Sequence, residues 1–139
     1  MTQLRISEAA RLLGVSDDTV RRWVESGALP HTTDDSRRMV IDGRDLARFA
    51  QAQASPVPDP SAVGRSARNT FTGLVARVLS DTVMSQVELQ CGPFRVVSLM
   101  STEAVRDLGL EAGCLAVAVI KSTNVIIETP TRHEPVPAS

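Results

Sequence analysis

The first fifty residues carry apolar side chains at the three- and four-residue spacing of amphipathic helices. Ser7 is expected to cap a first helix that stops at Gly14, and Ser16 to cap a second helix that stops at Gly27. Polar turn residues over 31–41 predict a short hairpin. The apolar positions are Ala9, Ala10, Leu12 and Leu13; then Val20, Trp23 and Val24; and, in a third helix starting at Asp42, Leu46 and Phe49.

The second half of the chain alternates apolar and polar positions, as strands do. Residues 83–91 show this best, because Val83, Ser85, Val87, Leu89 and Cys91 share one face. A short helix is expected over 102–108, before a turn from Gly109 to Gly113. The strands are predicted at 70–79, 83–91, 93–100, 114–121 and 123–128. Five short strands and one helix favour a small OB-like β-barrel.

The fold class that follows is α+β, with two domains. Residues 51–65 concentrate Pro, Ala, Ser and Gly without a usable period, which is typical of a semi-rigid linker. We therefore expect a mainly α-helical domain over 1–52, a linker over 53–65 and a β-barrel domain over 66–129. The Pro-rich segment 130–139 is expected to be a disordered tail.

Composition narrows the function classes. The chain has 15 Lys+Arg against 16 Asp+Glu in 139 residues, so bulk positive charge is not its means of binding a partner. Lys121 is the only lysine. Cys91 and Cys114 are too few for a zinc site and are expected to be reduced and buried. With no signal peptide and no long apolar run, we expect a cytoplasmic protein without membrane association.

A helix, a Gly-Val-Ser turn and a second helix form the layout of a helix-turn-helix. The segment ISEAARLLGVSDDTVRRWVESGALP resembles the MerR and excisionase-type winged helix-turn-helix family over about residues 4–50. Small residues at Ala9 and Gly14 are expected to let the helices approach closely. The resemblance implies binding to double-stranded DNA, with the second helix in the major groove.

Four arginines lie where the resemblance places DNA contacts. Arg21 and Arg22 would touch phosphates or guanine edges from the second helix, next to the exposed Asp17 and Asp18. Arg37 and Arg38 would contact the DNA backbone from the hairpin, as a wing. Alternatively, these arginines form a solvated helix face and a charged hairpin. Residues 1–55 hold eight Arg and eight acidic residues, so one copy should bind DNA weakly and two should bind better.

Three motifs of the second half occur in a fixed order: Ser66-Ala67-Arg68-Asn69, Leu108-Gly109-Leu110 followed by Gly113, and Val119-Ile120-Lys121-Ser122. Together they resemble the Mop (TOBE) molybdate-binding domain over about 66–128. Molybdate is a tetrahedral dianion with four acceptor oxygens, so its site needs N–H and O–H donors and positive charge. Tungstate, of the same size and charge, is expected to bind as well.

The resemblance carries the molybdate-binding pattern over to Ser66, Arg68, Asn69, Lys121 and Ser122. Asn69 is expected to order backbone rather than touch the ion. Ser101 would come from a partner subunit, at a position where threonine is commoner in the family. Structural alternatives remain: Ser66 and Asn69 could cap a turn, Lys121 could guard an edge strand, and Ser101 or Thr102 could cap the helix.

A barrel of this size is small for independent stability, so the resemblance implies a homodimer or hexamer through the Mop domains. The function expected is a molybdate-sensing DNA-binding transcriptional regulator. The alternative is a molybdate or tungstate storage protein whose N-terminal unit is a docking module. An enzyme is not expected, because the chain has no Gly-rich phosphate loop and no catalytic His arrangement. No metal cation site is expected either.

Overall fold

The computed structural model describes residues 2–130 and divides the chain into two compact units, Met1–Pro56 and Val57–Ser139. The expected tail over 130–139 lies almost wholly outside the described residues. Each unit has its own sheet and its own buried cluster. Among the described residues, no helix is long and apolar enough to cross a membrane.

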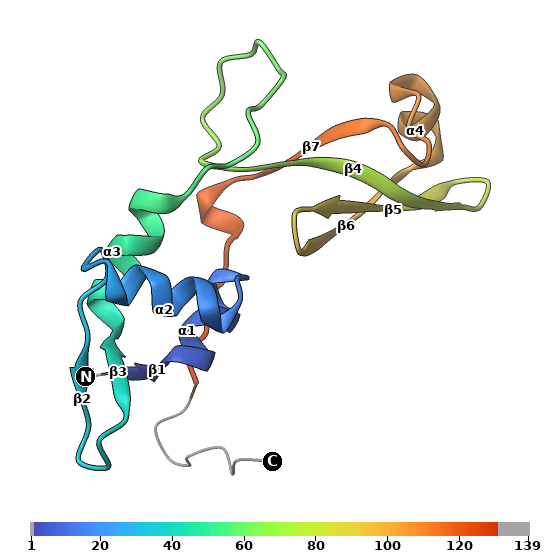
Figure 1. Cartoon of the computed structure of the whole chain (residues 1–139). Helices are drawn as coiled ribbons and strands as arrows, with labels where there is room; N and C mark the ends of the chain where they lie inside the picture. Colours follow the sequence, from blue (N-terminus) through green and yellow to red (C-terminus); the bar gives the residue numbers. More distant parts are fainter. Residues whose placement is uncertain (1, 131–139) are drawn as a thin grey trace. The chain divides into compact units, whose positions relative to one another are not determined.

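The first unit is built from three helices and a small sheet (Figure 1). Its sheet has the order β1-β3-β2, and both strand pairs are antiparallel. The hairpin and third helix expected from the sequence are confirmed, whereas the first strand had no sequence signal. The elements are β1 (Gln3–Arg5), α1 (Ile6–Leu13), α2 (Asp17–Glu25), β2 (Thr32–Thr33), β3 (Met39–Asp42) and α3 (Gly43–Gln53).

Of the two predicted helix caps in this unit, Ser16 is confirmed, and Asp42, the predicted start of the third helix, is the cap of α3. The Ser16 hydroxyl accepts a hydrogen bond from the Thr19 amide at 3.2 Å, and the Asp42 carboxylate accepts one from the Arg44 amide at 2.8 Å. The prediction for Ser7 is wrong, because α1 begins at Ile6 and its cap is Arg5, two residues earlier. Strand β1 runs directly into the helix there. The Glu8 carboxylate accepts from the Arg5 amide at 3.2 Å and supplies the polar partner.

The helices pack through small and branched side chains. Ala9, Val20 and Ile41 have no exposed surface, and Leu29 is 1% exposed. Trp23 packs against Phe49 with ring centroids 4.8 Å apart. Gly14 acts differently from the prediction, because no heavy atom lies within 4 Å of the position its Cβ would take. Its role is the left-handed backbone, at φ 68°, that ends α1.

The segment after α3 has no helix or strand up to residue 68. It is nevertheless tied to itself, because Asp59 and Arg65 form an ion pair at 3.1 Å. The Asp59 carboxylate also accepts from the Ser61 amide at 2.7 Å. The segment thus closes into a loop, which shortens the reach expected of an extended linker.

The second unit is an antiparallel sheet in the order β6-β5-β4-β7, with one helix after β6. In Figure 1, β4 is the long strand between β7 and β5. The short helix and four of the five predicted strands are confirmed. The elements are β4 (Asn69–Ser80), β5 (Met84–Cys91), β6 (Phe94–Ser101), α4 (Thr102–Leu108), β7 (Leu115–Ile120) and the short 3₁₀ helix η1 (Ser122–Asn124).

The two neighbours of β4 use different halves of it. Strand β7 pairs with β4 from Asn69 to Leu74, and β5 pairs with it from Leu74 to Ser80. Apart from Leu74, which pairs with both strands, and Val75, which bonds to Gly113 and Cys114, each half of β4 therefore has a paired strand on one side only. The core lies on the face that carries Val75, Val87 and Leu89, each 6% exposed or less.

The fifth strand predicted over 123–128 is wrong for the described chain, and the barrel is not closed. Instead, the Asn124 amide donates to the Lys121 carbonyl at 2.9 Å and the Val125 amide to the Ser122 carbonyl at 3.3 Å. This 3₁₀ turn directs the chain out of the sheet. Ile126 and Ile127, the apolar residues that predicted the strand, are each 84% exposed.

A buried set of hydroxyls fixes α4 to the β4–β5 turn. Thr102 Oγ1 donates to the Asp81 carbonyl at 2.9 Å, which leaves its oxygen free to accept from Ser85 Oγ, also at 2.9 Å. Ser85 in turn lies 2.7 Å from Ser80 Oγ. Ser85 is 1% and Thr102 6% exposed, so each buried hydroxyl has a partner. Cys91 is buried and Cys114 half-buried, and both are free thiols.

Candidate functional site

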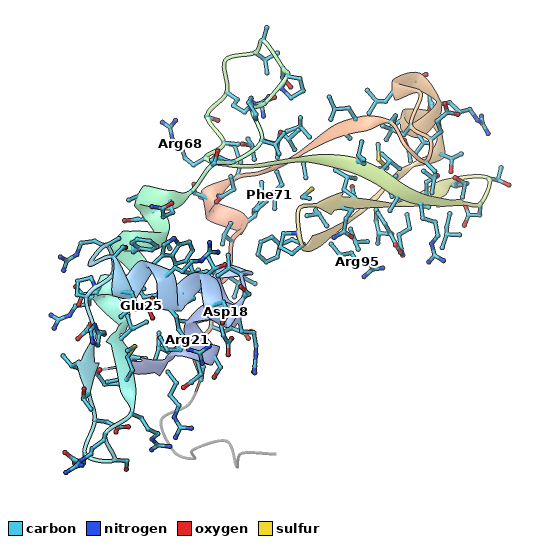
Figure 2. All side chains as sticks on the ribbon, viewed as in Figure 1. Asp18, Arg21, Glu25, Arg68, Phe71 and Arg95 are labelled. Atoms are coloured by element: carbon cyan, nitrogen blue, oxygen red, sulfur yellow. The ribbon has the colours of Figure 1, made fainter. Side chains whose placement is uncertain are left out.

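Helix α2 presents a charged face. Its buried residues are Val20 and Val24, which fix the opposite face against the core. The exposed residues are therefore those at the intervening positions: Asp17, Asp18, Arg21, Arg22 and Glu25. Figure 2 shows Asp18, Arg21 and Glu25 spread along this helix. All four charged residues that the sequence analysis expected on the second helix, Asp17, Asp18, Arg21 and Arg22, are thus exposed on α2.

The two arginines of α2 are oriented by local partners. Arg21 Nη1 donates to Asp18 Oδ1 at 3.2 Å, and Arg22 Nη2 donates to Thr19 Oγ1 at 3.3 Å. Thr19 Oγ1 also lies 3.0 Å from the hydroxyl of the capping Ser16. Thr19 had not been singled out from the sequence. The sequence feature that could have identified Thr19 is its spacing of three residues from both Ser16 and Arg22.

The β2–β3 hairpin holds Arg37 and Arg38 in a tight turn. Asp34 organises this turn, because one oxygen accepts from the Arg38 and Ser36 amides at 2.8 and 2.9 Å. These hydrogen bonds, the Arg38 one foremost, hold the pKa of Asp34 below its ordinary value. Arg37 is exposed and is the one non-glycine residue with positive φ, 61°, in the described chain. Glycine adopts this left-handed backbone at a lower cost than arginine does.

The two halves of the predicted oxyanion site meet at one end of the β4–β7 pair. Asn69 is the first residue of β4 and pairs with Ile120, the last residue of β7. The side-chain amide of Asn69 also donates, through Nδ2, to the Ile120 carbonyl at 3.3 Å. Ser66 and Arg68 precede this pair, and the chain continues directly into Lys121 and Ser122. Residues more than fifty positions apart are thereby brought to one end of the sheet.

The side chains at this end are open to solvent. Ser66, Arg68, Lys121 and Ser122 are all exposed, and Asn69 is half-buried. In Figure 2, Arg68 extends away from the sheet at the start of β4. Two cationic residues, Arg68 and Lys121, and two hydroxyl-bearing residues, Ser66 and Ser122, thus lie at the same end of the β4–β7 pair. This set contains donors and positive charge, as an oxyanion requires.

Ser101 lies elsewhere. It ends β6 and pairs with Met84, beside the end of β4 opposite to Asn69. The twelve residues of β4 separate the two ends by about 36 Å of strand. Within the chain, the Ser101 hydroxyl accepts from the Ala104 amide at 3.0 Å and caps α4. One chain alone does not bring Ser101 to the other predicted oxyanion ligands.

Comparison with known families assigns a domain type to each unit. The helix-turn-helix domain profile matches residues 4–54, and the TOBE domain profile matches residues 65–127. Among curated proteins, molybdenum-pterin-binding protein 3 of Clostridium pasteurianum is 41% identical over 63 residues, which are 45% of this chain and 93% of that protein. The molybdenum transport protein ModE of Herbaspirillum seropedicae is 37% identical over 65 residues, 46% of this chain and 24% of that protein.

Two solved structures resemble the same region. MopII from Clostridium pasteurianum is 34% identical, with a TM-score of 0.45, and covers 48% of this chain and 100% of its own. The cytoplasmic molybdate-binding protein ModG, with molybdate bound, is 40% identical, with a TM-score of 0.49, and covers 52% of each chain. Through residues 65–127 the chain belongs to the TOBE-domain family of the molybdenum-pterin-binding proteins, and it carries a helix-turn-helix domain over residues 4–54.

Proposed function

We propose that this protein is a molybdate-responsive DNA-binding transcriptional regulator. A helix-turn-helix domain and a TOBE domain in one chain support this, since the first is a DNA-binding type and the relatives of the second bind molybdenum compounds by name. The first unit is of the MerR and excisionase winged type, with α2 as recognition helix and the β2–β3 hairpin as wing. The chain works as a cytoplasmic binding protein and not as an enzyme.

Molybdate binds at the Asn69 end of the β4–β7 pair. The observation that carries this proposal is the Asn69–Ile120 pairing, which places Arg68 and Lys121 on adjacent strand ends. Their two positive charges match the dianion, and the hydroxyls of Ser66 and Ser122 donate hydrogen bonds to its oxygens. Asn69 orders the backbone through its bond to Ile120. Tungstate fits the same donors.

A second copy of the chain completes the site. Apart from Leu74 and Val75, each half of β4 has a paired strand on one side only. The sheet leaves an open, mainly apolar cavity of about 660 Å³, lined mostly by residues of β5, β6 and β7 and also by Pro60 and Ser61. Exposed Ile126 and Ile127 are apolar and lie in no helix or strand, so they are available to pair with such a sheet. In a homodimer or hexamer of this kind, Ser101 of the partner subunit contacts the ion. Within a single chain, Ser101 lies at the opposite end of β4 from the other ligands.

The DNA interface comprises the exposed charges of α2 and the wing: Asp17, Asp18, Arg21, Arg22, Arg37 and Arg38. Pairing the TOBE domains brings two helix-turn-helix domains to one DNA, and so compensates for the low positive charge of each. Molybdate, bound between subunits, shifts the assembly and thereby the spacing of the two helix-turn-helix domains.

Calorimetric titration of the full chain with molybdate, tungstate and sulfate tests the ion site. Wild type should bind molybdate and tungstate, and Lys121→Ala should weaken both by about tenfold or more, because a charge-assisted contact contributes about 1.5–3 kcal/mol. Arg106→Ala, which removes one exposed positive charge from α4, is the matched control and should leave affinity unchanged. Equal affinity in Lys121→Ala and wild type would overturn the site.

The storage alternative has a distinct outcome. Several ions bound per assembly, without retention of any DNA sequence, would make the chain a molybdate store with an N-terminal docking module. Sequence-specific DNA retention that responds to molybdate is the outcome expected of the regulator.

A further inference from the structure

The exposed face of α2 has an unexpected charge for a recognition helix. It carries three carboxylates, Asp17, Asp18 and Glu25, against the two guanidinium groups of Arg21 and Arg22. Its formal charge is therefore −1, two positive minus three negative. Such a face is repelled by phosphates, which usually supply most of the affinity of a DNA-binding protein. Its carboxylates are compatible with DNA only where they meet hydrogen-bond donors.

In the major groove, the donors are base amino groups. Cytosine presents its N4 amino group there, and its partner guanine presents the adjacent acceptors O6 and N7. A carboxylate beside a guanidinium is complementary to this arrangement, because the carboxylate accepts from cytosine while the guanidinium donates to guanine. An A·T pair presents no two adjacent acceptors for the guanidinium and adds the thymine methyl group.

Asp18 and Arg21 form such a pair. Arg21 Nη1 lies 3.2 Å from Asp18 Oδ1, and the side chains are 54% and 89% exposed for Arg21 and Asp18. Only one oxygen of Asp18 takes part in this contact. Asp17 stands beside it in the same helical turn and forms no ion pair within the described residues. Asp17 thus shares the stabilising effect of an acidic residue at a helix start, but not the contact with arginine.

We infer that Asp18 is a specificity-determining residue, and that the Asp18–Arg21 pair reads one G·C base pair in the operator. This inference rests on the proposed DNA-binding function and deepens it. Asp18 accepts from the cytosine amino group and holds Arg21 toward guanine. The same carboxylate disfavours non-specific contact with phosphates, so specificity comes with a lower overall affinity.

The test begins with selection of binding sites from a random DNA pool by the full-length wild type, Asp18→Ala and Glu25→Ala. Both variants remove one exposed carboxylate from α2, so their effects on the charge of this face are matched. Both should bind random DNA more tightly than wild type. Only Asp18→Ala should lose the preference for G·C at one position, which in wild type should be about tenfold or more.

Base substitution then tests the contact directly. Replacing the selected cytosine by pyrimidin-2-one, which lacks the amino group, should weaken wild-type and Glu25→Ala binding by about tenfold and leave Asp18→Ala unaffected. If Asp18→Ala selects the wild-type site and is equally sensitive to the lost amino group, Asp18 does not read it and the inference is overturned. If wild type selects no site at all, the proposed DNA-binding function fails, and this inference with it.

Discussion

At the scale of single residues, the wing offers a separation of stability from DNA binding. Arg37 adopts φ 61°, a backbone region that costs an arginine more than a glycine. Arg37→Gly should therefore leave the free energy of unfolding unchanged or raise it by up to about 1 kcal/mol. The same variant should weaken DNA binding, because it removes the exposed guanidinium.

Denaturant unfolding and a DNA titration of the same protein check this prediction. Asp35→Gly is the control, because it changes the same turn without removing a positive charge. Arg48→Gly is unsuitable, because Arg48 lies within α3. Loss of stability together with retained DNA affinity in Arg37→Gly would show that the arginine serves the fold.

Gly73 is a second residue whose role follows from geometry. A Cβ at this position would meet the Gln90 carbonyl oxygen and would lie 2.7 Å from Cys91 Sγ. Since one contact is to backbone, the strands must move apart. Gly73→Ala should cost about 1–3 kcal/mol in the free energy of unfolding. Gly64→Ala, with no heavy atom near its Cβ, should change it little. Equal stabilities would refute the close approach of β4 and β5 at this point.

Residue-level expectations from sequence succeeded where a single local interaction decides. Ser16 and Asp42 cap their helices because a side-chain oxygen three or two positions before an amide suffices. The residue-level expectations failed where tertiary structure decides. Leu12 occupies an apolar helical position but is 68% exposed, and Gly14 serves backbone conformation and not packing.

At the scale of elements, the wing hairpin should depend on pH. Asp34 accepts two backbone hydrogen bonds in its ionised form, and its pKa is held below the ordinary value, chiefly by the Arg38 amide. A group with a lowered folded-state pKa stabilises the fold above its unfolded pKa, which is about 3.9 for Asp. This contribution is lost as the pH falls through the folded-state pKa.

Amide hydrogen exchange of Ser36 and Arg38 measures this effect. Protection at the two amides, corrected for intrinsic exchange rates, should fall below about pH 4 in wild type and be independent of acid in Asp34→Asn. Asp35→Asn, in the same turn but outside these hydrogen bonds, should behave as wild type. An acid-dependent loss of protection that persists in Asp34→Asn would assign the effect to another group.

Most elements could be predicted from the period of apolar residues, since three helices, the hairpin and four strands of the second unit follow it. Strand β1 and the 3₁₀ helix η1 could not, and the strand expected at 123–128 is absent from the described residues. Strand β1 has only three residues, Gln3–Arg5, and exists because it pairs with β3. The strand expected at 123–128 has the right composition but lacks a partner within the chain, so composition alone misassigned it.

At the scale of the whole molecule, the segment with Ile126 and Ile127, which pairs with no strand among the described residues, and the open sheet of the second unit predict an assembly of two or more copies of the chain. Wild type should have at least the mass of a dimer, whereas a chain carrying both Ile126→Asp and Ile127→Asp should be smaller. The reason is that carboxylates cannot be buried unpaired against an apolar sheet. Sedimentation analysis measures both masses. Val63→Asp, which alters an exposed valine of the linker loop, should retain the wild-type mass. A monomeric wild type would contradict the role given to the second copy.

The candidate oxyanion site shows the limit of sequence reasoning at this scale. Ser66, Arg68, Lys121 and Ser122 could be grouped by resemblance, and the Asn69–Ile120 pairing supplies the physical reason for their proximity. Ser101 lies at the far end of β4, so its part in the site depends on a partner subunit. No pattern within one chain contains that information.

The measurement that tests the central claim most directly is the affinity of the full chain for its selected DNA site, with and without saturating molybdate at fixed salt. Molybdate should change this affinity by about fivefold or more, the range of ordinary coupling between sites. Lys121→Ala should bind the same DNA as ion-free wild type and show no response. An identical affinity of wild type with and without molybdate would contradict the account.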